Sequence, residues 1–179
     1  MIMAPFVILD RDGVINADSP DYIKSASEWL PLPGSVEAIA RLTAAGCQVF
    51  VATNQAGIAR GKLSLDALEA IHQRMIAEVA DAGGLIVDIQ YCPHHPDDQC
   101  QCRKPQPGML LTLAARHDLD LREGYFVGDS AKDLEAAAAA DCQGVLVLTG
   151  NGKETLRSFP DHQATFTDLA EFVDHLLLR

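Results

Sequence analysis

The chain has 179 residues, 48% apolar content and a formal net charge of -11. This length and composition allow one domain with a sizeable core and exclude a disordered chain, while the acidic charge excludes sequence-independent binding to nucleic acid. The opening MIMAPFVILD lacks the features of a signal peptide, and no apolar run reaches the length of a membrane span, so we expect a cytoplasmic protein without membrane contact.

Short apolar segments alternate along the chain with segments of helical periodicity. In chain order, the expected strands are residues 6–10, 48–53, 86–91, 124–129 and 144–149. The expected helices are residues 34–46 with Ser35 as N-cap, 64–84 with Ser64 as N-cap, 107–118, 131–141 and 167–178. This order predicts the α/β class, with a doubly wound, mainly parallel sheet in a single domain spanning 1–179. Ligands of such sheets bind beyond the carboxyl ends of the strands.

Polar side chains follow the predicted strands at these ends. Asp10 and Asp12 follow the first strand, Thr53 ends the second, and Asp129 follows the fourth. Residues i and i+2 of an extended chain point the same way, so the carboxylates of Asp10 and Asp12 call for a cation. Together with Asp129 they form an oxygen-rich set that suits Mg²⁺. Taken singly, the turn Asp10–Gly13 also fits a solvated turn, and Asp129 a helix cap.

The segment CPHHPDDQCQCRKP, residues 92–105, concentrates cysteine and histidine. Three thiolates and one imidazole suit a closed, structural zinc site, and the predicted ligands in the zinc-binding loop 92–102 are Cys92, His94, Cys100 and Cys102. His95 is the competing ligand, and a disulfide or redox-inert loop is the alternative to metal. Cys47 and Cys142 lie in apolar surroundings and are expected in the core. A zinc clamp ending at Cys102 would hold the next two residues, Arg103 and Lys104, rigidly toward an anion.

These motifs, in this order, resemble those of the haloacid dehalogenase superfamily of phosphatases. The matching residues are Asp10-Arg11-Asp12-Gly13, Thr53, Lys104 and Gly128-Asp129 through Asp133. The resemblance implies that Asp10 is the nucleophile of an aspartyl-phosphate intermediate and that Asp12 is the general acid and base. It further implies that Asp10, the Asp12 backbone carbonyl and Asp129 hold Mg²⁺, and that Lys104 and Thr53 hold the phosphoryl oxygens. Asp133 would orient Lys104 or the metal shell.

Within the superfamily, the zinc loop joined to Arg103-Lys104-Pro105 is similar to the branch of histidinol-phosphate and heptose-bisphosphate phosphatases. The stretch TNQAGIARGKL, residues 53–63, favours enzymes that remove the C7 phosphate of D-glycero-D-manno-heptose 1,7-bisphosphate, usually for lipopolysaccharide core. The resemblance implies that the substrate-binding residues are Asp18, Ser19, Asp21, Tyr22, Asn54, Gln55, Ala56 and Arg103. The chain departs from the common pattern at Ala56, usually Ser, at Ser130, often Lys, and in the segment 16–25.

Other functions remain open at this point. Histidinol-phosphate phosphatase is the alternative with the same chemistry, and a non-catalytic zinc module that binds a phosphorylated partner is the alternative of another class. A polynucleotide phosphatase is disfavoured by the acidic charge. No insertion is long enough for a cap domain, and nothing marks an oligomer interface, so we expect a monomer acting on a small phosphorylated sugar.

Overall fold

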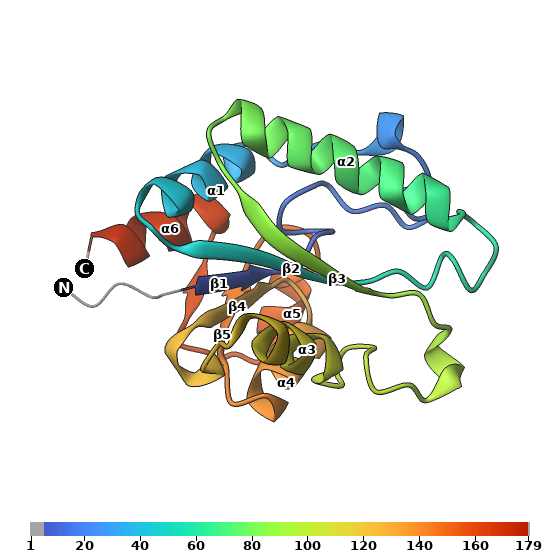
Figure 1. Ribbon diagram of the computed structural model, residues 1–179. Coiled ribbons are helices and arrows are strands. Elements are labelled where there is room, and N and C mark those ends of the chain that lie inside the picture. The colour runs from blue at the N-terminus through green and yellow to red at the C-terminus, as the bar shows by residue number, and fades with distance from the viewer. Residues whose placement is uncertain (1–5, 179) are drawn as a thin grey trace.

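A single six-stranded sheet organises the computed structural model, which describes residues 6–178 (Figure 1). The strands are β1 (Phe6–Leu9), β2 (Gln48–Asn54), β3 (Ile86–Cys92), β4 (Tyr125–Gly128), β5 (Gln143–Val147) and β6 (Thr165–Phe166). All neighbouring strands run parallel, in the order β3-β2-β1-β4-β5-β6. The chain builds β2 and β3 on one side of β1 and the later strands on the other, so the strand order reverses at the β1/β4 junction. Ligands of open parallel sheets bind at such a junction.

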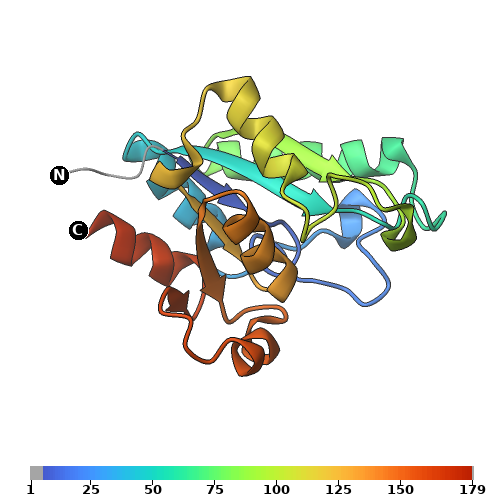
Figure 2. The ribbon, with the colours of Figure 1, turned by 90° about the horizontal axis from the view of Figure 1, so that it is seen from below.

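Helices cover both faces of the sheet, as the doubly wound prediction requires (Figures 1 and 2). The helices α1 (Ser35–Ala44), α2 (Leu65–Asp81) and α6 (Leu169–Leu177) pack on one face. The helices α3 (Gly108–His117) and α4 (Ala131–Ala139) pack on the other. Successive residues of β1 alternate between the two cores: Val7 and Leu9 face the first group of helices, and Phe6 and Ile8 face the second.

Several short elements were not predicted. Helix α5 (Gly152–Ser158) and the edge strand β6 follow β5, and three 3₁₀ turns lie at η1 (Ala26–Glu28), η2 (Pro96–Asp98) and η3 (Leu121–Glu123). They are short and carry few buried apolar residues, so the periodicity of the sequence contains little signal for them.

The two predicted helix caps have different outcomes. Ser64 caps α2 as expected, since its side chain accepts a hydrogen bond from the backbone N–H of Ala67. The prediction of Ser35 as a cap is wrong. Gly34 occupies the N-cap position of α1, and the Ser35 hydroxyl instead donates a 2.6 Å hydrogen bond to the Ile15 carbonyl. This bond ties α1 to the loop that follows β1.

In the part of the chain that the structure describes, no helix is long and apolar enough to cross a membrane. No large cap domain interrupts the sheet in residues 6–178, so the strand ends stay open to a ligand. Residues 1–5, part of the segment in which we expect no signal peptide, lie outside the described residues.

Candidate active site

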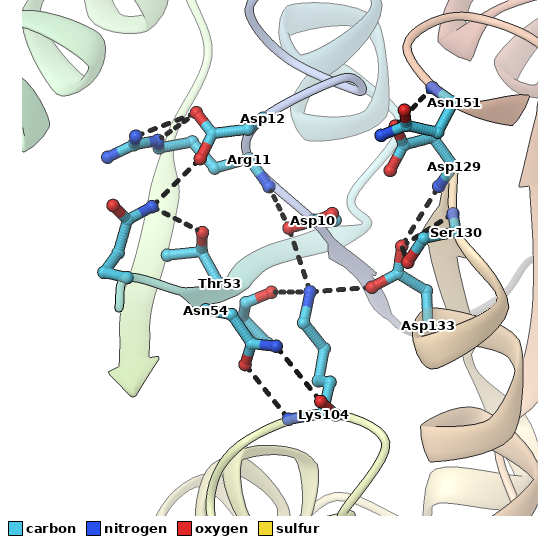
Figure 3. A network of polar contacts seen from close by, with 12 residues as sticks. Asp10, Arg11, Asp12, Thr53, Asn54, Lys104, Asp129, Ser130, Asp133 and Asn151 are labelled. Carbon is cyan, nitrogen blue, oxygen red and sulfur yellow. Dashed lines mark hydrogen bonds and ion pairs between the residues drawn. The ribbon is translucent and has the colours of Figure 1, made fainter. Parts of the chain in front are cut away.

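The carboxyl ends of β1, β2 and β4 meet around a cavity of about 430 Å³. It lies at the β1/β4 junction, where the strand order reverses. The lining includes the predicted chemical groups Asp10, Asp12, Thr53, Lys104, Asp129 and Asp133. The structure therefore brings together residues that are up to 123 positions apart in the sequence (Figure 3).

Lys104 lies at the centre of this site although its side chain is only 3% exposed. Its ammonium nitrogen lies 2.9 Å from Asp10 Oδ1 and 2.7 Å from Asp133 Oδ1, and it donates a 3.0 Å hydrogen bond to the Ala52 carbonyl. Burial disfavours the charge, but the carboxylates of Asp10 and Asp133 outweigh it and raise the pKa of Lys104 above its ordinary value. The lysine is thus a fixed cation, and its contact with Asp133 agrees with one of the two roles expected of this aspartate, that of orienting Lys104.

The backbone of Lys104 is held separately by Asn54, at the end of β2. The Asn54 amide nitrogen donates to the Lys104 carbonyl at 3.1 Å, and the Lys104 N–H donates to Asn54 Oδ1 at 3.0 Å. This pair of bonds copies the way one strand pairs with another, so it fixes the position of the loop relative to the sheet (Figure 3).

Asp10, Asp129 and Asp133 each place a carboxylate oxygen within 4.8 Å of the other two. Burial, followed by repulsion from Asp133, raises the pKa of Asp129 to about 7, and the same two causes raise the pKa of Asp10 well above its ordinary value. Asp129 can approach β1 because residue 13 is glycine: a Cβ there would lie 2.2 Å from Asp129 Oδ2. Mutually repelling, buried carboxylates with oxygen-only ligands fit a hard divalent cation.

The hydrogen bonds leave one oxygen free on each of two carboxylates. Asp10 Oδ1 accepts from the Arg11 N–H and contacts Lys104, and Asp129 Oδ2 accepts from the Asn151 N–H at 2.8 Å. Within residues 6–178, Asp10 Oδ2 and Asp129 Oδ1 accept no hydrogen bond. Asp133 Oδ2 accepts from Ser130 and from the Asp129 N–H, while its Oδ1 forms a 2.7 Å ion pair with Lys104 and accepts no hydrogen bond in residues 6–178.

Asp12 departs from the expectation that it shares a side with Asp10. The chain turns directly after β1, so the Asp12 carboxylate lies apart from the three clustered carboxylates, and Asp10 lies between Asp12 and Asp129 (Figure 3). Burial alone would raise the pKa of Asp12, but the Arg11 charge together with hydrogen bonds from Asn16, Arg11 and Gln55 outweighs it and lowers the pKa. The repulsion inferred from the i, i+2 spacing is thus removed by an arginine rather than by a shared cation.

Gln55 connects Asp12 to the predicted phosphate-binding hydroxyl. Its amide nitrogen donates to Asp12 Oδ2 at 3.0 Å and to Thr53 Oγ1 at 2.9 Å. The resemblance implied that Gln55 contacts substrate. It does line the cavity, but its amide N–H groups are directed at these two neighbours.

The cysteine loop forms a compact four-residue cluster. His94 Nδ1 lies 3.5 Å from Cys92 Sγ and 3.2 Å from Cys102 Sγ, and Cys100 Sγ lies 3.6 Å from each of the other two thiols. Zinc–sulfur bonds of about 2.3 Å place tetrahedral ligands about 3.8 Å apart, so these separations suit Zn²⁺. His95 does not join the cluster: its Nδ1 accepts from the Asp97 N–H at the start of η2.

All five cysteines are free thiols in the described structure, which argues against the disulfide alternative. Cys47 and Cys142 are buried, as predicted. Burial raises the pKa of each of these two thiols to about 12, so they are unreactive core residues.

Most of the residues predicted to contact substrate line the cavity, namely Asp18, Ser19, Tyr22, Asn54, Gln55 and Arg103. Asp21 and Ala56 do not. The Asp21 side chain is 68% exposed and pairs with Lys24, and Ala56 is buried and is not among the residues that line the cavity. Tyr22 has a positive φ of 62°, an uncommon conformation that turns the segment 16–25 back over the site.

Sequence reasoning missed Asn151, Lys132 and Arg11 as residues of this region. Asn151 and Lys132 line the cavity, and Asn151 holds Asp129. Asn151 belongs to TGNG directly after β5, so the rule that sites form at strand ends contained the signal. Arg11 lies inside the motif Asp10-Arg11-Asp12-Gly13, but nothing in the local sequence indicates which residues its guanidinium contacts.

Comparisons with known proteins agree with this geometry. Residues 101–172 match the family described as HAD-hydrolase-like. The chain is 56% identical to D-glycero-beta-D-manno-heptose-1,7-bisphosphate 7-phosphatase of Pseudomonas aeruginosa, over 96% of this chain and 97% of that protein. It is 37% identical to the protein of the same name from Vibrio cholerae, over 98% of this chain and 97% of that protein.

Two solved structures support the same assignment. The D,D-heptose 1,7-bisphosphate phosphatase of B. bronchiseptica, complexed with magnesium and phosphate, superposes with a TM-score of 0.94 at 50% identity, covering 97% of this chain and 98% of that one. The corresponding phosphatase of Burkholderia thailandensis superposes with a TM-score of 0.76 at 40% identity, covering 97% of this chain and 99% of that one. The chain therefore belongs to the family of heptose-1,7-bisphosphate 7-phosphatases within the haloacid dehalogenase superfamily of hydrolases.

Proposed function

We propose that the chain is a Mg²⁺-dependent phosphatase that removes the C7 phosphate of D-glycero-β-D-manno-heptose 1,7-bisphosphate. The observation that carries this proposal is Lys104, a buried cation held between Asp10 and Asp133 beside the free oxygen Oδ2 of Asp10. An anionic nucleophile attacking an anionic phosphate needs such a cation within reach. The relatives' shared name supports the substrate and its β anomer.

In the first proposed step, Asp10 Oδ2 attacks phosphorus, and the bond between phosphorus and the C7 oxygen breaks. This step uses the protonated form of Asp12, which is the minor form in the unliganded protein because the pKa of this carboxyl is lowered. Its proton passes to the departing oxygen, which leaves as the alcohol. In the second step, water attacks the aspartyl-phosphate, Asp12 takes the proton of that water, and Asp10 and inorganic phosphate are released. The two roles of Asp12 require an oxygen that can both give and take a proton. In residues 6–178 its Oδ2 accepts a single hydrogen bond, from Gln55, and Asp12 lines the cavity.

Lys104 and the Thr53 hydroxyl would hold the oxygens of the transferring group. The residues present fit Mg²⁺, which Asp10, the Asp12 carbonyl and Asp129 would hold. When bound, Mg²⁺ supplies positive charge that neutralises the phosphoryl oxygens. Asp133 stays outside this ligand set in the proposal, because its Oδ2 accepts from Asp129 and Ser130 and its Oδ1 is paired with the Lys104 ammonium.

Zinc in the cluster of Cys92, His94, Cys100 and Cys102 would be structural, since four protein ligands leave no open position. Arg103, the next residue, would bind the distal phosphate at C1. In support, Arg103 lines both the main cavity and a neighbouring one of about 370 Å³, and its Nη1 is buried without a hydrogen-bond partner in residues 6–178. An anion at that nitrogen would satisfy it.

The test is phosphate release with Mg²⁺ from three substrates: the α and β anomers of the heptose bisphosphate, and histidinol phosphate. We expect a preference for the β anomer of at least about tenfold in kcat/KM. Preference for the α anomer would reverse the anomer assignment. Preference for histidinol phosphate would keep the mechanism and overturn the substrate, and no release from any of them would favour the non-catalytic zinc module.

We further propose that the chain is a single domain, a cytoplasmic monomer, and acts in nucleotide-activated heptose synthesis for lipopolysaccharide core.

A further inference from the structure

Arg11 is a completely buried arginine, with 0% of its surface exposed. A buried guanidinium costs free energy unless its donors are all satisfied. Its Nε and Nη2 both donate to Asp12 Oδ1, at 3.0 and 2.8 Å, so one edge of the guanidinium is directed at the carboxylate (Figure 3). The other edge needs an acceptor elsewhere in the protein.

That acceptor is His72, which lies 61 residues away on α2. Its Nε2 is 3.2 Å from Arg11 Nη1, and the histidine is 4% exposed. Burial and then the neighbouring Arg11 charge lower the pKa of His72 to about 3, so the ring is neutral and can accept a hydrogen bond at Nε2. Asp12, which also faces the pair, opposes this lowering without reversing it. With His72, each of the three guanidinium nitrogens of Arg11 has a hydrogen-bond partner, and the guanidinium is held between Asp12 and α2.

The consequence appears at Asp12, whose two oxygens are unequal. Oδ1 accepts from Arg11 Nε, from Arg11 Nη2 and from Asn16 Nδ2, the last at 2.9 Å. Within residues 6–178, Oδ2 accepts from Gln55 alone, and Asp12 is one of the residues that line the cavity. An oxygen that already accepts three donors has no lone pair left for a proton. Any proton on this carboxyl group therefore resides on Oδ2.

We propose that His72 is a positioning residue for phosphoryl transfer: through Arg11 it holds Asp12 so that Oδ2 presents the proton to the leaving oxygen. This inference rests on the proposed function and deepens it, since it places a helix residue in a second layer behind the general acid. In the step concerned, Asp10 Oδ2 bonds to phosphorus, the bond from phosphorus to the leaving oxygen breaks, and the proton passes from Asp12 Oδ2 to that oxygen.

The leaving group provides the test. A sugar alkoxide leaves poorly without a proton, whereas p-nitrophenolate leaves readily as the anion. A misplaced general acid should therefore slow the sugar phosphate and spare p-nitrophenyl phosphate. For His72→Leu we expect kcat/KM to fall about 10- to 100-fold on the heptose bisphosphate and by less than about threefold on p-nitrophenyl phosphate, because general acid catalysis contributes about 10²- to 10⁴-fold in total. Inhibition by inorganic phosphate should not change.

Two further variants control this measurement. His72→Gln keeps an acceptor for Arg11 and should retain most of the activity on the sugar phosphate. Met75→Leu alters a fully buried residue on the next turn of α2 and should leave both substrates unaffected. Should His72→Leu not fold, His72→Phe gives the same test, because a phenyl ring fills the space of the imidazole and offers Arg11 no nitrogen acceptor.

Each outcome of these measurements either supports or overturns the role of His72. A loss confined to the sugar phosphate, with rescue by His72→Gln, supports the inference. An equal loss on both substrates, or no loss, overturns it, since either result makes His72 a packing residue only. Failure of the wild-type protein to hydrolyse either substrate with Mg²⁺ would instead overturn the proposed function, so the two failures are distinguishable.

Discussion

The active site draws its charges from two regions that position them differently. Asp10 and Asp129 follow β1 and β4, whose residues are almost completely buried, so the packed sheet fixes these carboxylates. Lys104 follows the cysteine loop, in which the turn η2 has no buried residue. Its position depends on the Cys92, His94, Cys100 and Cys102 cluster and on the two hydrogen bonds to Asn54.

The difference teaches that one site can have two separable sources of rigidity. The hydrophobic core sets where the acidic groups stand, because the strands cannot move without breaking it. The cysteine loop has no comparable core. It depends on the Cys/His cluster, which can hold a zinc ion, and on the two hydrogen bonds from Asn54 to keep the Lys104 ammonium in place. Changes in the loop should therefore reduce activity while the fold survives, and the four predictions below test this separation, from the largest expected effect to the smallest.

Asp10→Asn removes the proposed nucleophile from the rigid region. We expect kcat to fall about 10⁴-fold or more, because an amide cannot replace the attacking carboxylate. The melting temperature should not fall, since the substitution relieves repulsion from Asp133 and Asp129. Kinetics with Mg²⁺, zinc analysis and thermal melts check this. Substantial residual turnover would contradict the role of Asp10, and loss of zinc would show that the two regions are not separate.

Cys102→Ser weakens the loop. We expect loss of most of the zinc and about a 10- to 100-fold fall in kcat/KM, because Arg103 and Lys104 lose their anchor. Metal analysis and kinetics provide the measurement. The matched control is Cys47→Ser, which alters a buried cysteine outside the loop and should lower the melting temperature while leaving zinc content unchanged. Full activity in a zinc-free Cys102→Ser protein would disprove the proposed scaffold role of zinc.

A pH titration of stability probes the acidic cluster. The pKa of Asp129 is about 7 in the folded protein and about 3.9 when unfolded. Between these values the folded state binds a proton that the unfolded state does not, so stability without Mg²⁺ falls as pH rises and levels off above about pH 7. From pH 5.5 to 7.5 we expect a loss of about 2 kcal/mol.

Melting curves of the wild-type and Asp129→Asn proteins without Mg²⁺, compared at each pH, measure the contribution of Asp129 together with its effect on the pKa of Asp10, because more distant titrating groups act in both. The difference between them should shrink as pH falls. Saturating Mg²⁺ should flatten the wild-type profile, since the cation stabilises the ionised carboxylate. Parallel profiles of the two proteins would contradict the raised pKa of Asp129.

Much of the rigid region could be predicted from the sequence. The apolar strands before Asp10 and Asp129 are local signals, and the rule that parallel strands present ligand groups at one edge predicted their meeting. The four zinc ligands were predicted from residue type and spacing, whereas the role of Lys104 was implied by the resemblance to the haloacid dehalogenase superfamily. These features depend on a few neighbouring residues or on the general geometry of a parallel sheet.

The contacts that link distant segments could not be predicted in this way. Arg11 and His72 are 61 positions apart, and the clamp from Asn54 to Lys104 spans 50. A buried histidine on a helix has the same periodicity whether it packs in the core or accepts from an arginine, and an asparagine at a strand end suits either a ligand or a clamp. Only the folded structure distinguishes these roles, which is why Asn54 was assigned to substrate alone.

Asn54→Ala provides the finest test of the two-region comparison, because it removes the clamp and leaves both the core and the zinc ligands intact. The Lys104 backbone loses two hydrogen bonds, and we expect kcat to fall about tenfold as the ammonium drifts from Asp10. Gln48→Ala, at the exposed start of the same strand, is the matched control and should leave kcat unchanged. A fall in affinity for the sugar with kcat unchanged would identify Asn54 as a substrate ligand. A fall in zinc content would instead show that the Asn54 hydrogen bonds and the Cys/His cluster hold the loop jointly. The loop would then be held by one cooperative unit, not by two independent contacts.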